Sequence, residues 1–425
     1  MISRVTNWLN VQDSRYIFLL LLLVVLPSFE APKNLFALLY VFSWLFIAYR
    51  EKNWGGKWRL IDTIISFLLF GSIVVSINAV IIHDFSAKGI TDLIRYLLIF
   101  WVLSRHILTN KQITILCMVA VFSTAISLIY SFIMCPQGGI CLELNSVGHV
   151  NHSAIYLVIA YSIALSLLLI NFFVLPNYQK TLLILSTLFI AYATVDAHSR
   201  AASGLFFFVT LLGFFYAVVH YKNWRFGLMT VLILILGSYL TDVPKFTDDL
   251  IKTFKTSQSL SDVPGRKNIR NFSYYAFKTY PMLGVGFGNF NNLGHEHIKD
   301  KVIEDLGIYE KEKYAPYVHT HNVYYNFLVS GGIVMFSAFL WFFAQIIISI
   351  WKVRKQNNRK ELRYIDNVEV IEYRDDRFLI LSSSMVVLIV LSIGFVNTTL
   401  NHEHAILSMF VLGLLISKDR EINAK

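Results

Sequence analysis

The sequence predicts an all-α polytopic membrane protein with about twelve transmembrane helices and one large outer loop that contains short helices. Of its 425 residues, 56% are hydrophobic and 15% are charged, whereas soluble domains carry about 25% charged residues. Apolar runs of about 20 residues recur along the whole chain, which is the length that crosses about 30 Å of hydrocarbon as a helix. Lys and Arg are unevenly divided between the loops, and this division orients the chain in the membrane.

The first apolar run extends from Tyr16 to Pro27 and lacks an obvious small-x-small cleavage site after it, so we expect a first span rather than a signal peptide. The seventh and eighth runs are joined only by the Asp196–Arg200 corner, which must be a tight turn. The predicted spans lie approximately at 16–30, 34–49, 60–82, 90–109, 113–134, 152–175, 181–198, 201–220, 225–241, 323–351, 378–398 and 403–418.

The loop charges place both termini in the cytoplasm. The short loops on the other side hold only Lys33, Lys88 and Arg200, so residues 242–322 lie outside. Three parts follow: 1–241 with spans one to nine, the loop 242–322, and 323–425 with spans ten to twelve and a charged cytoplasmic loop at 352–377. The net charge of +10 is explained by the cytoplasmic loops, so no nucleic-acid partner is expected. The cytoplasmic segments and adjoining span ends hold Arg4, Arg15, Arg50, Lys52, Lys57, Arg59, Arg105, Lys111, Lys180, Lys222, Arg225, the cluster from Lys352 to Arg377, Lys418, Arg420 and Lys425.

The outer loop is rich in aromatic residues, so we expect it to fold and to carry function. Residues Arg266–Tyr280 have helical spacing of apolar side chains, and Pro281 should end that helix. Gly284, Gly286 and Gly288 then predict a flexible turn. They do not form a dinucleotide fingerprint, because they lack the preceding buried strand and the following helix.

The three cysteines are too few for a disulfide framework. Cys117 lies inside an apolar run and is expected to pack there. Cys135 and Cys141 flank a short loop, and they form a disulfide if that loop faces an oxidising compartment. The sequence leaves both states open.

His319, His321 and Asn322 lie where the polar loop ends and the tenth span begins. Histidine has an unperturbed pKa near neutral pH and suits general-base catalysis. A second interpretation is an interfacial histidine pair with Asn322 as the helix cap. A zinc site with His295 and His297 is a third, but no cysteine or close-set carboxylate pattern completes it, so no metal is expected.

Three arginines are candidates for binding an anion. Arg200 and Arg266 lie on the outer side, and a guanidinium pairs with phosphate through two parallel hydrogen bonds. Arg200 could instead pair with Asp196 or a lipid headgroup. Arg95 lies inside the fourth span, where an ionisable group usually faces the bundle interior, and a pair with Asp92 is its alternative.

Together these motifs resemble the O-antigen ligase (WaaL) and O-antigen polymerase superfamily of bacterial envelope enzymes. The resemblance rests on His198-Ser-Arg200, on Gly265-Arg266 followed by Tyr280–Phe290, and on His319-Thr-His-Asn322 followed by Gly331-Gly-Ile333. With twelve spans and one large loop before the tenth, the likeness covers nearly the whole chain. One position departs from the ligase pattern: Met335 stands where ligases carry Gly, Thr or Tyr.

The resemblance implies a metal-independent, inverting glycosyltransferase of the bacterial inner membrane whose active site faces the periplasm. The donor would be O-antigen linked to undecaprenyl pyrophosphate and the acceptor a sugar hydroxyl of lipid A–core, with membrane lipids as surroundings and no cofactor. His321 would be the general base, and Arg200 and Arg266 would hold the diphosphate. The predicted substrate-binding residues are His319, Asn322, Arg95 and Arg270.

Two enzyme alternatives stay open within the superfamily. A polymerase would extend a second carrier-linked glycan, and a protein O-oligosaccharyltransferase would use a Ser or Thr. A secondary transporter is a less favoured alternative, because transporters place polar groups near the midplane on broken spans, whereas the unusual polar groups here gather at the outer face.

Overall fold

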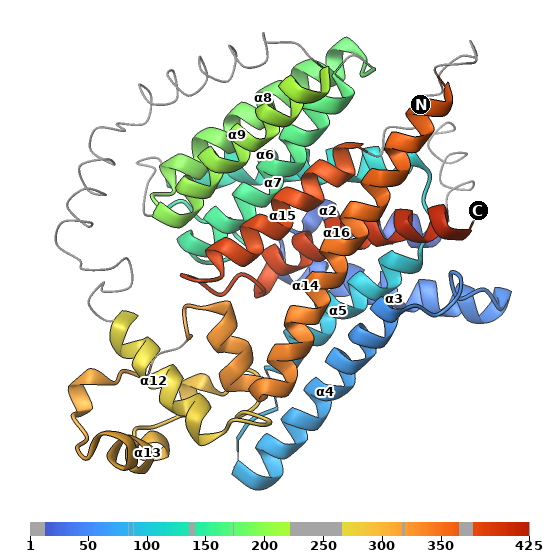
Figure 1. Cartoon of the computed structure of the whole chain (residues 1–425). Coiled ribbons are helices and arrows are strands. Elements are labelled where there is room, and N and C mark those ends of the chain that lie inside the picture. The colour runs from blue at the N-terminus through green and yellow to red at the C-terminus, as the bar shows by residue number, and fades with distance from the viewer. Residues whose placement is uncertain are drawn as a thin grey trace.

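The computed structural model describes residues 13–83, 85–87, 89–135, 141–172, 174–221, 266–316, 319–364 and 377–424. Within these ranges the chain is helical and contains no strand (Figure 1). The α-helices are α2 (Ser14–Val25), α3 (Glu30–Glu51), α4 (Leu60–His83), α5 (Ile90–Arg105), α6 (Asn110–Met134), α7 (Val150–Asn171), α8 (Asn177–Asp196), α9 (Arg200–Tyr221), α12 (Arg266–Thr279), α13 (Glu296–Leu306), α14 (Val323–Tyr364), α15 (Arg377–Ile393) and α16 (His402–Ala424), with 3₁₀ turns η2 (Phe290–Asn292) and η3 (Lys311–Lys313).

The predicted fold class is confirmed: the protein is an all-helical polytopic membrane protein. Among the described helices, seven are long and apolar enough to cross a membrane, and α2 and α15 are shorter apolar helices. Every predicted span falls on a helix except the ninth, 225–241, which lies outside the described residues. The tight corner before Arg200 is also present, since α8 ends at Asp196 and α9 begins at Arg200.

Helix α7 forms the centre of the bundle. Its apolar window is 94% buried, because α6, α8, α9, α15 and α16 all pack against it. A helix that is apolar all round needs such enclosure. Around this centre, α5 packs on α16, α2 packs on α3, and α4 packs on α14. The outer helices carry exposed apolar side chains such as Phe42 and Ile133, which suit contact with lipid.

Ionic contacts join the helices at the end of the bundle remote from α12. The carboxylate of Asp62 is fully buried and accepts hydrogen bonds from Arg105 Nε at 3.0 Å and from Arg420 at 2.5 Å. These contacts tie α4 to α5 and α16. An unpaired buried carboxylate would be very costly, so the two arginines and Asp62 stabilise one another only as a group.

Helix α14 extends further than the predicted tenth span. It continues through Lys352 to Tyr364, so the first half of the predicted loop 352–377 is helical. This extension contains no Gly or Pro and several good helix formers, which explains why the helix does not end where the apolar run does. Residues 365–376 lie outside the described residues.

A break in α14 at Gly332 holds the outer loop against the bundle. Gly332 has φ +63° and ψ −168°, so the helical hydrogen-bond ladder is interrupted there. The segment after α12 takes up the freed groups: Val285 N donates to Val329 O at 2.9 Å, Gly286 N donates to Ser330 O at 2.9 Å, and Ile333 N donates to Pro281 O at 2.8 Å. Residues 284–290, which we call the glycine turn, therefore fit into the break of α14 at Gly331 and Gly332. We call this hydrogen-bonded contact the joint.

The outer loop has its own small core. The predicted helix Arg266–Tyr280 is confirmed as α12, and its buried Phe272 packs with residues from the glycine turn and from α13, including Phe290 and Val302. Figure 1 shows α12 and α13 together at one end of the molecule, beside the beginning of α14. We call this end, where residues 85–87, 141–149, 198–200 and 394–401 also lie, the site end.

Cys135 and Cys141 form a disulfide, with Cα atoms 6.0 Å apart, while Cys117 is free and buried. The bridge closes the loop between α6 and α7 at the site end.

Candidate active site

Hydrogen bonds from side-chain and backbone atoms of Asn322 and Val323 fix the start of α14. Asn322 caps the helix, since its Oδ1 accepts from Tyr325 N at 2.9 Å, and its Nδ2 donates to Phe395 O at 3.0 Å. Val323 N donates to Gly394 O at 2.8 Å. The cap expected as an alternative role is thus real, and it serves to hold His321 in place.

Three histidines at helix starts adopt the left-handed backbone conformation: His198 at φ 51°, His321 at φ 48° and His402 at φ 48°. This conformation is uncommon for residues other than glycine and is found mostly where the surrounding structure enforces it, often at functional sites. All three begin or precede a helix at the site end.

His321 is a neutral base in this environment. Burial lowers its pKa to about 4, and the charge of Arg266 together with His319 and His149 adds to the lowering. At pH 7 the ring is therefore uncharged, which is the state that accepts a proton. His319, two residues away, also has a lowered pKa, caused by burial and then by His402 and His149.

Arg200 and Arg266 bring two positive charges to the same place. Desolvation lowers the pKa of Arg266, and repulsion from Arg200 lowers it further, so the two guanidinium groups are close. Both side chains keep surface open to solvent. Each is the first residue of its helix, α9 or α12, where backbone N–H groups also favour an anion. This combination suits a doubly charged phosphate group.

Arg270 lies one turn further along α12, and its charge acts on Tyr325 in the first turn of α14. It therefore faces the same region as His321. Arg95 belongs to a different group of residues: it pairs with Asp92, as its alternative role required, and it also donates to Asn34.

His295 and His297 lie apart from His319 and His321. His295 Nδ1 bonds to Tyr309 and His297 Nδ1 bonds to the Tyr280 hydroxyl at 2.9 Å, so both help to build the loop core. Within the described ranges, no group of three or more His, Cys, Asp or Glu side chains is placed to hold a metal ion.

A second group of histidines lies behind His319 and was not predicted. His152, on the first turn of α7, has its ring centroid 6.4 Å from that of His319, 5.6 Å from that of His149, and 5.2 Å from those of both His402 and His404. We call His149, His152, His402 and His404 the inner histidine cluster. The sequence did contain a signal for this cluster. These histidines lie at the starts of the sixth and twelfth predicted spans, on the side of the membrane that the loop charges also predict for His321.

The inner histidine cluster borders a buried ion pair. Lys33 of α3 pairs with Glu403 of α16, and Ser146 bonds to both, at 3.1 Å to the Lys33 Nζ and 3.3 Å to the Glu403 Oε1. The lysine expected as an ordinary loop charge is only 2% exposed.

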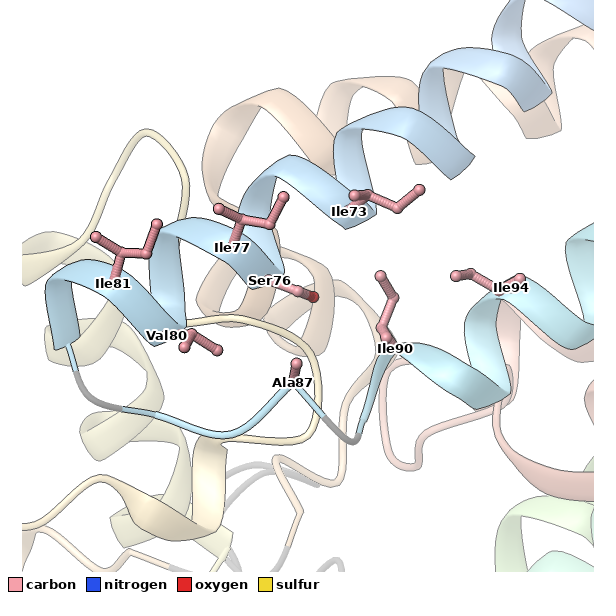
Figure 2. Close-up of a pocket in the computed structure, with 8 residues that line it drawn as sticks. All are labelled: Ile73, Ser76, Ile77, Val80, Ile81, Ala87, Ile90 and Ile94. Carbon is pink, nitrogen blue, oxygen red and sulfur yellow. The ribbon is translucent and has the colours of Figure 1, made fainter.

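An apolar groove of about 480 Å³ lies between α4 and the beginning of α5 (Figure 2). Two residues at one end of the groove contact the glycine turn. Ser86 N donates to Asn289 Oδ1 at 3.0 Å, and Gly89 packs directly against Phe287 and Gly288. The groove thus runs along the membrane helices up to the turn that follows α12. It is lined by Ile73, Ser76, Ile77, Val80, Ile81, Ala87, Ile90 and Ile94.

Comparison with protein families shows a likeness over part of the chain. Residues 184–340 match the family model described as O-antigen ligase. The comparison with curated proteins found no match. The matched region contains Arg200, Arg266, His321 and the Gly332 break, the elements that build the site above. The protein is therefore a polytopic membrane protein whose residues 184–340, which carry the site elements, are similar to the O-antigen ligase family.

Proposed function

We propose that this protein transfers O-antigen polysaccharide from undecaprenyl pyrophosphate to a sugar hydroxyl of lipid A–core. The observation that carries the proposal is the convergence of one neutral histidine, His321, with two arginines, Arg200 and Arg266. These groups match the needs of the reaction: a base for the acceptor hydroxyl and fixed positive charge for the leaving diphosphate.

In the proposed reaction His321 takes the proton from the acceptor hydroxyl. The hydroxyl oxygen attacks the anomeric carbon on the face opposite the diphosphate, and the bond to the diphosphate breaks with its electron pair leaving on the phosphate oxygen. Attack from the opposite face inverts the anomeric configuration. Arg200 and Arg266 stabilise the charge that builds on the leaving group, so this scheme needs neither a nucleophilic carboxylate nor a metal.

The groove between α4 and α5 supports a polyprenyl donor. A polyprenyl tail needs an apolar surface that reaches the place where its diphosphate is bound, and the groove ends at the segment fastened to the glycine turn. Inside the bilayer the tail exchanges contacts with lipid for contacts with the groove, so the groove would orient the tail rather than drive its binding by the hydrophobic effect.

Loop charges support placing the site at the periplasmic face of the inner membrane, with both termini in the cytoplasm. The loops assigned to the outer side by charge are the ones that meet at the site end, and the disulfide there suits an oxidising compartment.

A polymerase of the same superfamily remains the alternative because of Met335. That side chain is fully buried and packs against Gly71 of α4 and Gly331, so the departure from the ligase pattern concerns the packing of α14 against α4. Reconstitution with each acceptor distinguishes the two enzymes.

The test is reconstitution of the purified protein with undecaprenyl-pyrophosphate-linked glycan and two acceptors, lipid A–core and a second carrier-linked glycan. We expect extension of lipid A–core, undiminished by excess EDTA. His321→Ala and Arg266→Ala should each lower the rate on the order of 10² to 10⁴-fold, whereas Lys267→Ala, the exposed neighbour on the same helix, should not. Extension of the carrier-linked glycan would make the protein a polymerase, and transfer by His321→Ala at the wild-type rate would overturn the role of His321.

A further inference from the structure

The inner histidine cluster contains polar atoms that are buried without a hydrogen-bond partner. In the described part of the chain these include the Nδ1 atoms of His152 and His404 and the Oε2 of Glu403. The three residues are 8%, 0% and 1% exposed. Buried polar groups are almost always bonded to protein or to ordered water, and leaving one unbonded costs on the order of 1–3 kcal/mol. Three such atoms within neighbouring residues indicate an internal site for hydrogen-bonding molecules as small as water.

The cluster connects the site to solvent. His319 lies between His321 and His152, since it acts on the charge of His321 and its ring contacts His152 at 6.4 Å between centroids. His149 lies 5.6 Å from His152 between ring centroids, and its charge also acts on His319 and His321. It is exposed to solvent, and its Nδ1 accepts from Asn151 N at 3.1 Å. His321, His319, His152 and His149 thus form one group that extends from the base to solvent, with His152 as its buried member.

The remaining members hold His152 in this group. The ring of His404 stacks on that of His152 with an interplanar angle of 10°, and His404 Nε2 is within 3.2 Å of Thr398 O, so its Nε2 carries the hydrogen and its Nδ1 is an acceptor. His402 lies on a second side of His152. The charged groups that face the cluster are the Lys33–Glu403 pair and, toward His402, Asp92, Arg95 and Glu30.

A base that has taken a proton must lose it before the next turnover. Arg266 stands beside His321 and disfavours its protonated ring, so the ring does not hold the proton after the reaction. Arg266 and His319 are both neighbours of His321, and His319 connects it to the inner histidine cluster.

We propose that His152 relays the proton of the acceptor hydroxyl from His321 and His319, through hydrogen-bonded water in the inner histidine cluster, to His149 and bulk solvent. In each transfer an N–H or O–H bond breaks at the donor and an equivalent bond forms at the next ring nitrogen or water oxygen, so no oxidant, reductant or metal takes part. This relay rests on the proposed function, because it needs a hydroxyl proton to carry.

The first test measures hydration without using activity. Deuterium exchange at the C2 position of each histidine, followed by mass spectrometry, requires water at the ring. His106 is the matched control, since it is equally buried at 4% exposed but bonds Tyr40 at the other end of the bundle. We expect His152 and His404 to exchange about ten-fold faster than His106, in keeping with local water access. Exchange as slow as that of His106 would overturn the relay.

The second test separates proton transfer from packing. In the reconstituted reaction, His152→Ala should lower kcat on the order of 10²-fold with the KM of both substrates little changed, and added imidazole should restore much of the rate. His152→Phe keeps an aromatic ring without a nitrogen, so it should be as slow as the alanine variant and should not respond to imidazole. The matched control His297→Phe, in the loop core, should react at the wild-type rate.

Wild-type activity of His152→Phe, or an alanine variant that imidazole does not help, would overturn the relay while leaving the proposed function intact. Failure of the wild-type protein to transfer glycan to any acceptor would overturn the proposed function, and the relay with it.

Discussion

At the scale of single residues, His321 shows how strongly its position determines its chemistry. Its backbone has φ 48°, its cap neighbour is bonded to the end of α15, and its ring lies between one arginine and other histidines. A free histidine would be partly protonated near pH 6.5. Here burial and the adjacent positive charge remove that protonated state at physiological pH.

This arrangement predicts the response of the His321 pKa to substitution of Arg266. The neighbouring positive charge disfavours the protonated ring, so Arg266→Ala should raise the pKa from about 4 toward the ordinary value, while Arg266→Lys should keep it low. The pKa can be measured from the pH dependence of C2 deuterium exchange at His321. An unchanged pKa in the alanine variant would mean that Arg266 is not a close neighbour.

The same pKa sets the acid limit of activity. A general base works in its deprotonated state, so kcat/KM in the free enzyme should stay constant above about pH 5 and fall as the pH drops through about 4. The anionic donor counteracts Arg266 once bound, so the acid limb of kcat should lie at higher pH than that of kcat/KM. The two pH profiles in the reconstituted reaction check this, and an acid limb at the same or lower pH in kcat would contradict it.

At the scale of elements, the joint between the glycine turn and the break in α14 positions the site. A Cβ on Gly332 would lie 2.1 Å from Met282 O, and its φ of +63° is unfavourable for any side chain. Gly332→Ala should therefore push the loop away from α14 and separate Arg266 from His321. We expect glycan transfer to fall on the order of 10²-fold, the effect of misplacing a reacting group by about 1 Å. Gly204→Ala in α9 meets no atom within 4 Å and is the matched control. Normal transfer by Gly332→Ala would show that the joint does not position the site.

The groove between α4 and α5 yields a second prediction at this scale. Ile77→Trp should fill part of the groove and weaken use of long polyprenyl donors more than use of donors with a short prenyl chain. Ile133→Trp is a suitable control, since Ile133 is a similarly exposed apolar residue on α6, outside the groove. The measurement is the ratio of KM values for the two donors in each variant. Equal ratios in both variants would show that the tail lies elsewhere.

At the scale of the whole molecule, the orientation in the membrane decides which compartment the site faces. Leu306 of α13 is 59% exposed at the site end, and Trp58 is 58% exposed near the opposite end. A membrane-impermeant maleimide added to intact spheroplasts should label Leu306→Cys at once, and Trp58→Cys only after permeabilisation. The native cysteines give little background, since Cys117 is buried and the other two are bridged. The reverse labelling pattern would contradict the proposed topology.

The whole bundle also depends on contacts that no local pattern contains. Lys33 was expected as a loop charge, yet it is buried against Glu403, which is 370 residues away in the chain. The arginine in span four pairs with Asp92 and lies beside the inner histidine cluster. In both cases the charge is tolerated because a partner from the same or another helix satisfies it.

By itself the sequence determined what depends on local composition: which segments are long and apolar enough to be helices, where α12 begins and ends, and which residue types could do the chemistry. These follow from near-neighbour periodicity and from the unfavourable contact with water that each apolar side chain avoids. Only the tertiary structure decided that the glycine turn fits into the break of α14, that Arg266 lies beside both Arg200 and His321, and that four further histidines gather behind His319. Such meetings depend on how helices far apart in the chain pack together, and this packing follows from the fit of whole surfaces that no single stretch of sequence contains.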